Sequence, residues 1–189
     1  MGKIVLVRHG QDEDNAKRIL NGRRNAPLTT LGVTQAYDLT DKLRMAGLNI
    51  KHVFSSPLQR AHKTAEICSR VLSVPHTVME CLMERNHGIL EGHPYSDIPR
   101  LAKSFKIAYG FTYVLEVEGG ENYSELCERA KIVLSEIQNK ILELKINGNV
   151  LVVSHGAISR ALETVHKGLT HENIFDSPSF SNCEFRILE

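Results

Sequence analysis

Two histidines of this chain follow short aliphatic runs, and each is followed by a glycine. His9 comes after Arg8 and the run IVLV at residues 4–7, and His155 comes after NVLVVS at residues 149–154. Such runs are typical of strands buried on both faces of a parallel sheet. Because the ligand crevice of an open α/β sheet lies outside the carboxyl ends of its strands, we expect both histidines to face one pocket.

The position of an arginine in the sequence is further evidence for an anion-binding pocket. In SSPLQRAHKTAEICSRVL, residues 55–72, Ser56 has the character of a helix N-cap and Pro57 that of a first helical residue. Arg60 then lies in the first helical turn, where the helix dipole disfavours a cation by roughly 0.3 to 1 kcal/mol. A bound anion would compensate for this cost.

Glycines complete the predicted anion site. Gly10 and Gly156 allow backbone N–H groups to approach a ligand closely. A helix that begins after Gly156 would offer its free amides to a phosphate. Together with Arg8, Arg60 and the two histidines, these amides predict a pocket for a tetrahedral anion.

The segments that must position these residues alternate between strand and helix. Apolar spacing and capping residues predict a helix within 28–47, a strand at 52–54, a helix from 57 to 72, a short helix near 96–105, a long helix over 122–144 with a capping box, a helix from about 157, and a last strand at 183–188. The alternation predicts an α/β fold, a three-layer sandwich with a mainly parallel sheet covered by helices on both faces.

Composition limits the function classes. The chain has 189 residues, of which 42% are hydrophobic and 24% charged, as expected of a single domain over residues 1–189. A formal net charge of +1 provides no global field for nucleic acid, so anion recognition must be local. The aliphatic runs are too short to span a bilayer, and Arg8 interrupts the first before it could serve as a signal-peptide core. We expect a cytoplasmic protein without a membrane partner.

The cysteines indicate neither a metal site nor a redox motif. The four stand far apart in the sequence, without the close spacing of thiolate ligands: Cys68, Cys81, Cys127 and Cys183. We expect reduced thiols, most of them packed as small apolar residues.

Five segments resemble, in this order, the motifs of the histidine phosphatase superfamily in its phosphoglycerate mutase-like branch. They are LVRHGQDEDN, GRRNAPLTTLG, SSPLQRAHKTA, LMERNHGILEG and VVSHGA. A lone RHG tripeptide would be weak evidence because tripeptides recur by chance, but five motifs in family order are specific. The resemblance extends from Ile4 to about Ala161 and implies a phosphoglycerate mutase-like fold.

The resemblance also implies a mechanism. His9 would attack phosphorus to form a phosphohistidine, which requires a neutral ring whose other nitrogen is held by a carbonyl near Gly10. Arg8, Arg60 and His155 would bind the phosphoryl oxygens, and neither metal nor cofactor is implied.

Other site residues follow from the same resemblance. Glu84 matches the family's acid, which protonates the leaving oxygen and later deprotonates water. Asn15 and Gly22 match residues that line the pocket, although both could also be turn residues, and the Gly156 amide would add a phosphate contact. Glu91 lies seven residues after Glu84, so either carboxylate could face the pocket.

Two departures from the family pattern bear on substrate and outcome. Asp12 stands where a small hydroxyl residue is usual, which places a carboxylate near the phosphate site. The mutases carry paired arginines between the acid, here Glu84, and a GGE segment, here residues 119–121. In this chain the basic residues of that stretch are isolated: Arg100, Lys103 and Lys106. A mutase must keep its phosphorylated intermediate from water. Without the basic clamp, hydrolysis is favoured.

The sequence therefore predicts a phosphomonoesterase whose partner is a small-molecule phosphate ester, with a specificity insertion at about 90–118. Three alternatives remain open at this point: a phosphoglycerate mutase, a protein phosphohistidine phosphatase, and a non-catalytic phosphate-binding module.

Overall fold

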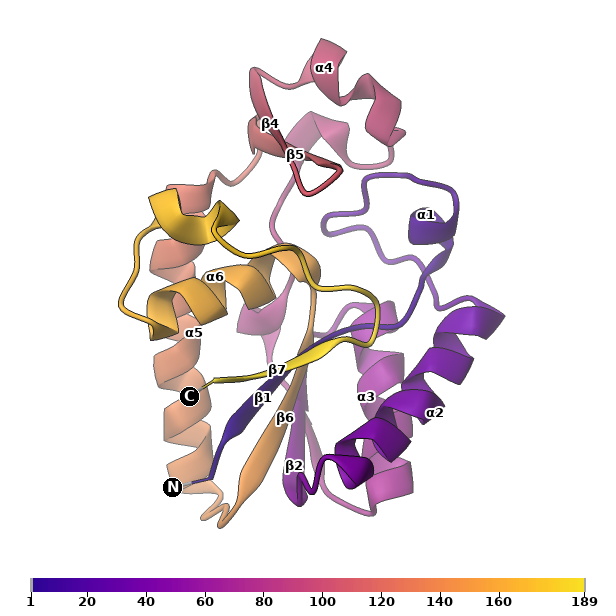
Figure 1. The fold of residues 1–189 in the computed structure, drawn as a ribbon, viewed down its shortest axis with the longest axis vertical. Helices are drawn as coiled ribbons and strands as arrows, with labels where there is room; N and C mark the ends of the chain where they lie inside the picture. Colours follow the sequence, from indigo (N-terminus) through magenta and orange to yellow (C-terminus); the bar gives the residue numbers. More distant parts are fainter. Residues whose placement is uncertain (1, 189) are drawn as a thin grey trace.

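Figure 1 shows the computed structural model of the chain, which describes residues 2–188. Its main sheet has five strands in the order β3-β2-β6-β1-β7. Four strands are parallel to their neighbours and the last is antiparallel to β1. The strands are β1 (Ile4–Arg8), β2 (Ile50–Ser55), β3 (His76–Val78), β6 (Asn149–Ser154) and β7 (Phe185–Leu188). The mainly parallel sheet is confirmed.

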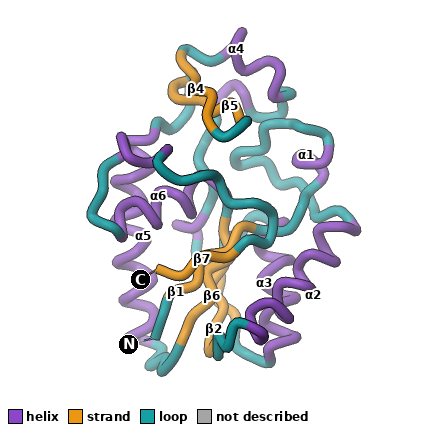
Figure 2. Tube along the Cα trace, viewed as in Figure 1, coloured by secondary structure: helices purple, strands orange, loops and turns teal. Residues whose placement is uncertain are grey.

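Helices cover both faces of this sheet, as Figures 1 and 2 show. On one side lie α2 (Thr30–Met45) and α3 (Gln59–Leu72), and on the other lie α5 (Tyr123–Glu143) and α6 (Gly156–His166). Successive strand residues point to opposite faces. In β1, Leu6 packs into the cluster under α5 and α6, whereas Val5 and Val7 pack into the cluster under α2 and α3. The aliphatic run of β1 therefore fills two cores, and the three-layer prediction is confirmed.

Smaller elements lie beyond the carboxyl ends of the parallel strands. They are α1 (Glu13–Ala16), α4 (Ile98–Leu101), the antiparallel hairpin of β4 (Ser104–Ala108) and β5 (Phe111–Glu116), and the short 3-10 helices η1 (Glu80–Leu82), η2 (Gly88–Leu90), η3 (Tyr95–Asp97) and η4 (His171–Phe175). Figure 1 shows the hairpin and α4 at the end of the molecule away from the two termini.

The hairpin was not expected from the sequence. The predicted short helix over 96–105 ends already at Leu101, and β4 begins at Ser104. Ala108 pairs with Phe111, so the turn consists of Tyr109 and Gly110, both with positive φ. Such a turn usually carries Asn-Gly or Asp-Gly. With tyrosine in the first position, the sequence lacks the pattern from which a two-residue hairpin turn is predicted.

The start of α3 also differs from the prediction. Its first helical residue is Gln59 rather than Pro57, and Leu58, not Ser56, occupies the N-cap position. Arg60 nevertheless lies in the first turn. The capping box of α5 is confirmed, since Asn122 and Glu125 each accept the other's backbone N–H at 2.9 Å.

The described part of the chain contains no helix that is both long and apolar enough to cross a membrane. The four cysteines are free, and Cys68, Cys127 and Cys183 are buried.

Candidate active site

The two histidines that follow the aliphatic runs meet at one edge of the sheet. β1 and β6 are paired in parallel with Arg8 opposite Ser154, so both strands end at the same level of the sheet. The ring centroids of His9 and His155 are 5.1 Å apart, and the rings are inclined by 61°. Both side chains are buried. The structure thus brings together two residues that are far apart in the sequence.

The hydrogen bonds of His9 define its tautomer. Nδ1 lies 2.7 Å from the carbonyl oxygen of Gly10, which can only accept, so Nδ1 carries the proton. Nε2 lies 3.1 Å from Nε of Arg60, which can only donate, so Nε2 holds a lone pair. Burial, followed by the charges of Arg60 and Arg8, lowers the pKa of His9 well below 6.5. The ring is neutral, with its nucleophilic nitrogen opposite an arginine.

Arg60 is buried and donates to four acceptors. Besides His9, it donates from Nη1 to Asn21 Oδ1 at 3.2 Å and to the Arg24 carbonyl at 2.6 Å, and from Nη2 to the Gly22 carbonyl at 2.7 Å. Gly22 therefore contributes a carbonyl that orients the guanidinium.

The two candidate glutamates have different places. Glu91 Oε1 accepts the backbone N–H groups of Arg23 at 2.9 Å and of His87 at 3.0 Å, so Glu91 holds the loop after Gly22. Glu84 instead reaches the start of α6, where it accepts the N–H groups of Ala157 and Ile158. This is the helix that follows His155 directly, which favours Glu84 as the carboxylate of the site.

These contacts correct one prediction. The free amides at the start of α6 were expected to bind phosphate. Two of them donate to Glu84, at 3.2 Å from Ala157 and 3.1 Å from Ile158. The Arg85 N–H also donates to Glu84, at 2.8 Å. The Ala157 and Ile158 amides therefore hold a carboxylate and are not free for a phosphate, whereas the Gly156 amide is not among the donors to Glu84.

Arg8 and Asn15 are linked to the C-terminal segment of the chain. Arg8 donates from Nη1 to the Phe180 carbonyl at 2.8 Å and from Nη2 to Asn15 Oδ1 at 3.3 Å. Asn182 donates to Asn15 Oδ1 at 3.1 Å and to the His9 carbonyl at 3.0 Å. Sequence reasoning missed Asn182, because it lies in no motif and reaches the site only through the fold.

Two hydroxyl side chains were also missed. Ser56 Oγ lies 2.8 Å from His155 Nε2, so this residue orients a histidine instead of capping α3. Thr64 accepts the Gly10 N–H at 3.1 Å and donates to the Arg60 carbonyl at 2.7 Å. Thr64 stands one helical turn after Arg60, and that spacing was the only available signal.

Gly22 allows a direct test of this loop. Its φ is +55°, and a Cβ there would lie 2.2 Å from Glu91 Oε1. We expect Gly22→Ala to lower the free energy of unfolding by about 1 to 2 kcal/mol for the left-handed backbone, plus the cost of moving Glu91. It should also lower kcat/KM, because a shift of the loop would move the residue-22 carbonyl away from Arg60. Urea unfolding and steady-state kinetics with a phosphate ester measure both effects.

Gly47→Ala is the matched control. Gly47 has a φ of +66°, and no atom lies within 4 Å of the place that a Cβ would take, so the variant should lose stability for the backbone alone. Equal kinetics in the two variants would contradict the role given to the Gly22 loop.

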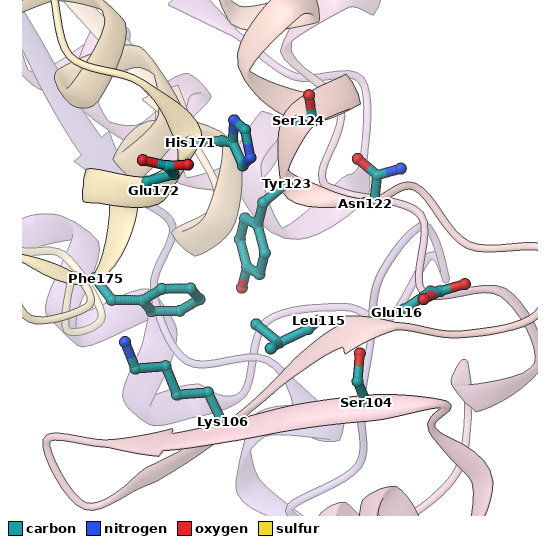
Figure 3. A pocket seen from close by; sticks show the side chains of 10 residues that line it. All are labelled: Ser104, Lys106, Leu115, Glu116, Asn122, Tyr123, Ser124, His171, Glu172 and Phe175. Atoms are coloured by element: carbon teal, nitrogen blue, oxygen red, sulfur yellow. The ribbon is translucent and has the colours of Figure 1, made fainter.

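A separate hollow of about 500 Å³ lies under the β4–β5 hairpin, between the start of α5 and η4 (Figure 3). Its walls include Leu115, Tyr123 and Phe175, with Lys106 at one side. None of the five residues with an expected catalytic role lines it.

Comparison with known proteins identifies the family to which this chain belongs. The model of the histidine phosphatase superfamily, branch 1, matches residues 4–189. The chain belongs to the histidine phosphatase superfamily. A curated relative from Methylobacterium sp. (strain 4-46), named 2,3-bisphosphoglycerate-dependent phosphoglycerate mutase, is 34% identical over 176 residues, which cover 90% of this chain and 83% of the relative.

Solved structures of proteins named as phosphatases share the fold. A mycobacterial glucosyl-3-phosphoglycerate phosphatase superposes with a TM-score of 0.81 at 22% identity, covering 99% of this chain and 92% of that one. Phosphoserine phosphatase from Entamoeba histolytica, solved with 3-phosphoglyceric acid, gives a TM-score of 0.78 at 21% identity, covering 99% and 90%. Membership of the superfamily supports phosphoryl chemistry for this chain, while the curated relative is named a mutase and the two structural neighbours are named phosphatases.

Proposed function

We propose that this histidine phosphatase is a phosphomonoesterase that hydrolyses a small phosphorylated metabolite through a phosphohistidine on His9. Two buried nitrogens carry the proposal, one on the residue before His9 and one on the His155 ring, whose centroid lies 5.1 Å from that of His9. Arg8 Nε and His155 Nδ1 are buried and have no hydrogen-bond partner among the described residues. Buried polar atoms without partners are rare and need an explanation. A phosphoryl group on its way to His9 would supply the missing acceptors.

The proposed roles follow from these contacts. Nε2 of His9 attacks phosphorus while Nδ1 keeps its proton on the Gly10 carbonyl. Arg8 and Arg60 neutralise the phosphoryl oxygens. In the proposed tautomer the Ser56 hydroxyl donates a hydrogen bond to His155 Nε2, so Nδ1 carries the ring proton and can donate it to a phosphoryl oxygen.

Glu84 is the proposed proton carrier. Its carboxylate is held at the start of α6, directly after His155 and Gly156. In the first step it delivers a proton to the leaving oxygen, and in the second it takes one from the attacking water. Asn15, bonded to Arg8, and the Gly156 amide line the phosphate pocket in this proposal.

The contacts of the basic residues in the 90–118 segment favour hydrolysis over transfer. Arg100 bonds to Asp97 at 3.1 Å, and Lys103 Nζ lies 3.5 Å from Glu116. Lys106 Nζ lies 4.9 Å from the centre of the Phe175 ring, in the separate hollow. Each of these cations has a partner outside the histidine site, so none is placed to hold the second anionic group of a mutase substrate.

The first test is hydrolysis of para-nitrophenyl phosphate with a metal chelator present. We expect chelator-resistant turnover and an acid-labile phosphoryl label on the protein. Because the pKa of His9 is lowered, the rate should not show the roughly tenfold fall between pH 7.5 and 5.5 that an ordinary histidine would produce. Initial rates at saturating substrate across this range measure it.

Other outcomes would change the assignment. The mutase is the second candidate, favoured by the name of the 34% identical relative. Isomerisation of 3-phosphoglycerate that depends on a bisphosphate primer and outpaces hydrolysis would establish it. Tight phosphate binding without turnover of any ester would indicate a binding module instead.

A further inference from the structure

We propose that Asp12 is a positioning residue that speeds phosphorylation of His9 by stabilising the positive charge that forms on its ring. The inference rests on the proposed phosphohistidine route. Asp12 places a negative charge inside a site built for anions, so its presence needs a reason.

One carboxylate oxygen of Asp12 has a simple structural role. Oδ1 accepts the Asn15 N–H at 2.8 Å and caps the short helix α1. A serine, threonine or asparagine would serve equally well as a cap. The cap therefore explains one oxygen but does not explain the charge.

The second oxygen faces the nucleophile. Asp12 is completely buried, and its Oδ2 has no hydrogen-bond partner among the described residues. This oxygen lies 3.7 Å from His9 Nδ1 and 3.4 Å from Arg60 Nε. The Nδ1 proton goes to the Gly10 carbonyl and the Nε proton goes to His9 Nε2. Oδ2 therefore acts on the His9 ring through its charge.

The surroundings make this charge costly. Burial raises the pKa of Asp12, against the Asn15 N–H, Arg60 and Arg8, which lower it. Asp14, on the same short helix, adds to the rise. An acid with a raised pKa lowers the stability of the fold as pH rises above its ordinary value. A destabilising charge beside a nucleophile is typical of a functional group.

The charge affects the two chemical steps in opposite directions. In the first, Nε2 of His9 bonds to phosphorus, the bond to the ester oxygen breaks, Glu84 protonates that oxygen, and the ring becomes cationic because Nδ1 keeps its proton. Asp12 stabilises this cation. In the second, water oxygen bonds to phosphorus and passes a proton to Glu84. The bond between Nε2 and phosphorus breaks and its electron pair returns to the ring, which becomes neutral again; Asp12 opposes this loss of positive charge. Asp12 also repels the bound phosphate dianion.

Asp12→Asn tests the proposal, because asparagine keeps the shape and the cap but removes the charge. In rapid-quench experiments with labelled para-nitrophenyl phosphate, we expect phosphoenzyme to form about tenfold more slowly. A neighbouring opposite charge stabilises a cation by at least about one pKa unit, which corresponds to a factor of about ten. Inorganic phosphate should inhibit more strongly. Asp12→Ser, a second uncharged cap, should behave alike, and Asp41→Asn on the exposed side of α2 controls for net charge.

Stability provides an independent readout. At pH 8 Asp12→Asn should melt at a higher temperature than the wild type, and the gain should vanish below about pH 4, where the carboxyl is protonated in both states.

Unchanged phosphoenzyme formation in both variants would overturn the proposal and leave Asp12 as a cap only. Weaker phosphate inhibition in Asp12→Asn would also overturn it, since Asp12 would then act as a protonated donor to phosphate. If the wild type forms no phosphoenzyme, it is the proposed function that fails.

Discussion

Replacing His9 with alanine should lower kcat/KM for para-nitrophenyl phosphate by at least roughly 1,000-fold, because no other nucleophile can take over its place. His155 has a ring centroid only 5.1 Å away, but its Nε2 is engaged by Ser56. The acid-labile phosphoryl label should disappear with the activity. Steady-state kinetics and acid quenching of labelled protein measure both.

Two controls separate lost chemistry from lost folding. Inorganic phosphate should still raise the melting temperature of His9→Ala, because Arg8, Arg60 and His155 remain. His171→Ala removes an exposed histidine from η4 and should leave the kinetics unchanged. A loss of less than about tenfold in His9→Ala would rule out the phosphohistidine route.

Arg60→Lys should lower kcat by about 100- to 1,000-fold, although the charge is retained. A lysine ammonium has three donors on one atom and cannot span the acceptors of Asn21, Gly22 and Arg24 while also facing His9. Arg60→Ala should in addition lower the free energy of unfolding by about 3 to 5 kcal/mol, because Asp12 stays buried without its nearest cation. Kinetics and urea unfolding distinguish the two effects.

Arg70→Lys is the matched control for this substitution. Arg70 stands on the same helix, but its side chain is exposed and donates to the Tyr37 hydroxyl. It should change neither quantity appreciably. Wild-type kcat in Arg60→Lys would show that only the charge of Arg60 matters and that its fixed geometry does not.

Arg60 and Asp12 also connect the predictions. Arg60 faces both the lone pair of His9 and the unpartnered oxygen of Asp12. A double variant of Arg60→Lys with Asp12→Asn should therefore deviate from the sum of the single effects, since residues in one charge network do not act independently.

The sequence by itself determined the parallel sheet, the two histidines and Arg60. Their signals are local: an aliphatic run predicts a buried strand, a glycine marks its polar end, and parallel strands end at one edge. The resemblance to the superfamily motifs indicated Glu84 but left Glu91 open, because spacing along the chain does not show which carboxylate meets α6.

Only the tertiary structure decided the details on which the chemistry of the site depends. The His9 tautomer depends on a neighbouring carbonyl and on Arg60, which stands 51 positions away. Asn182 and the Phe180 carbonyl reach the site from the opposite end of the chain, and Ser56 turned out to orient His155. The unpartnered oxygen of Asp12 is visible only when every neighbouring donor is accounted for. Hydrogen bonds between distant segments have no signature in sequence periodicity, because packing, not local propensity, brings their donors and acceptors together.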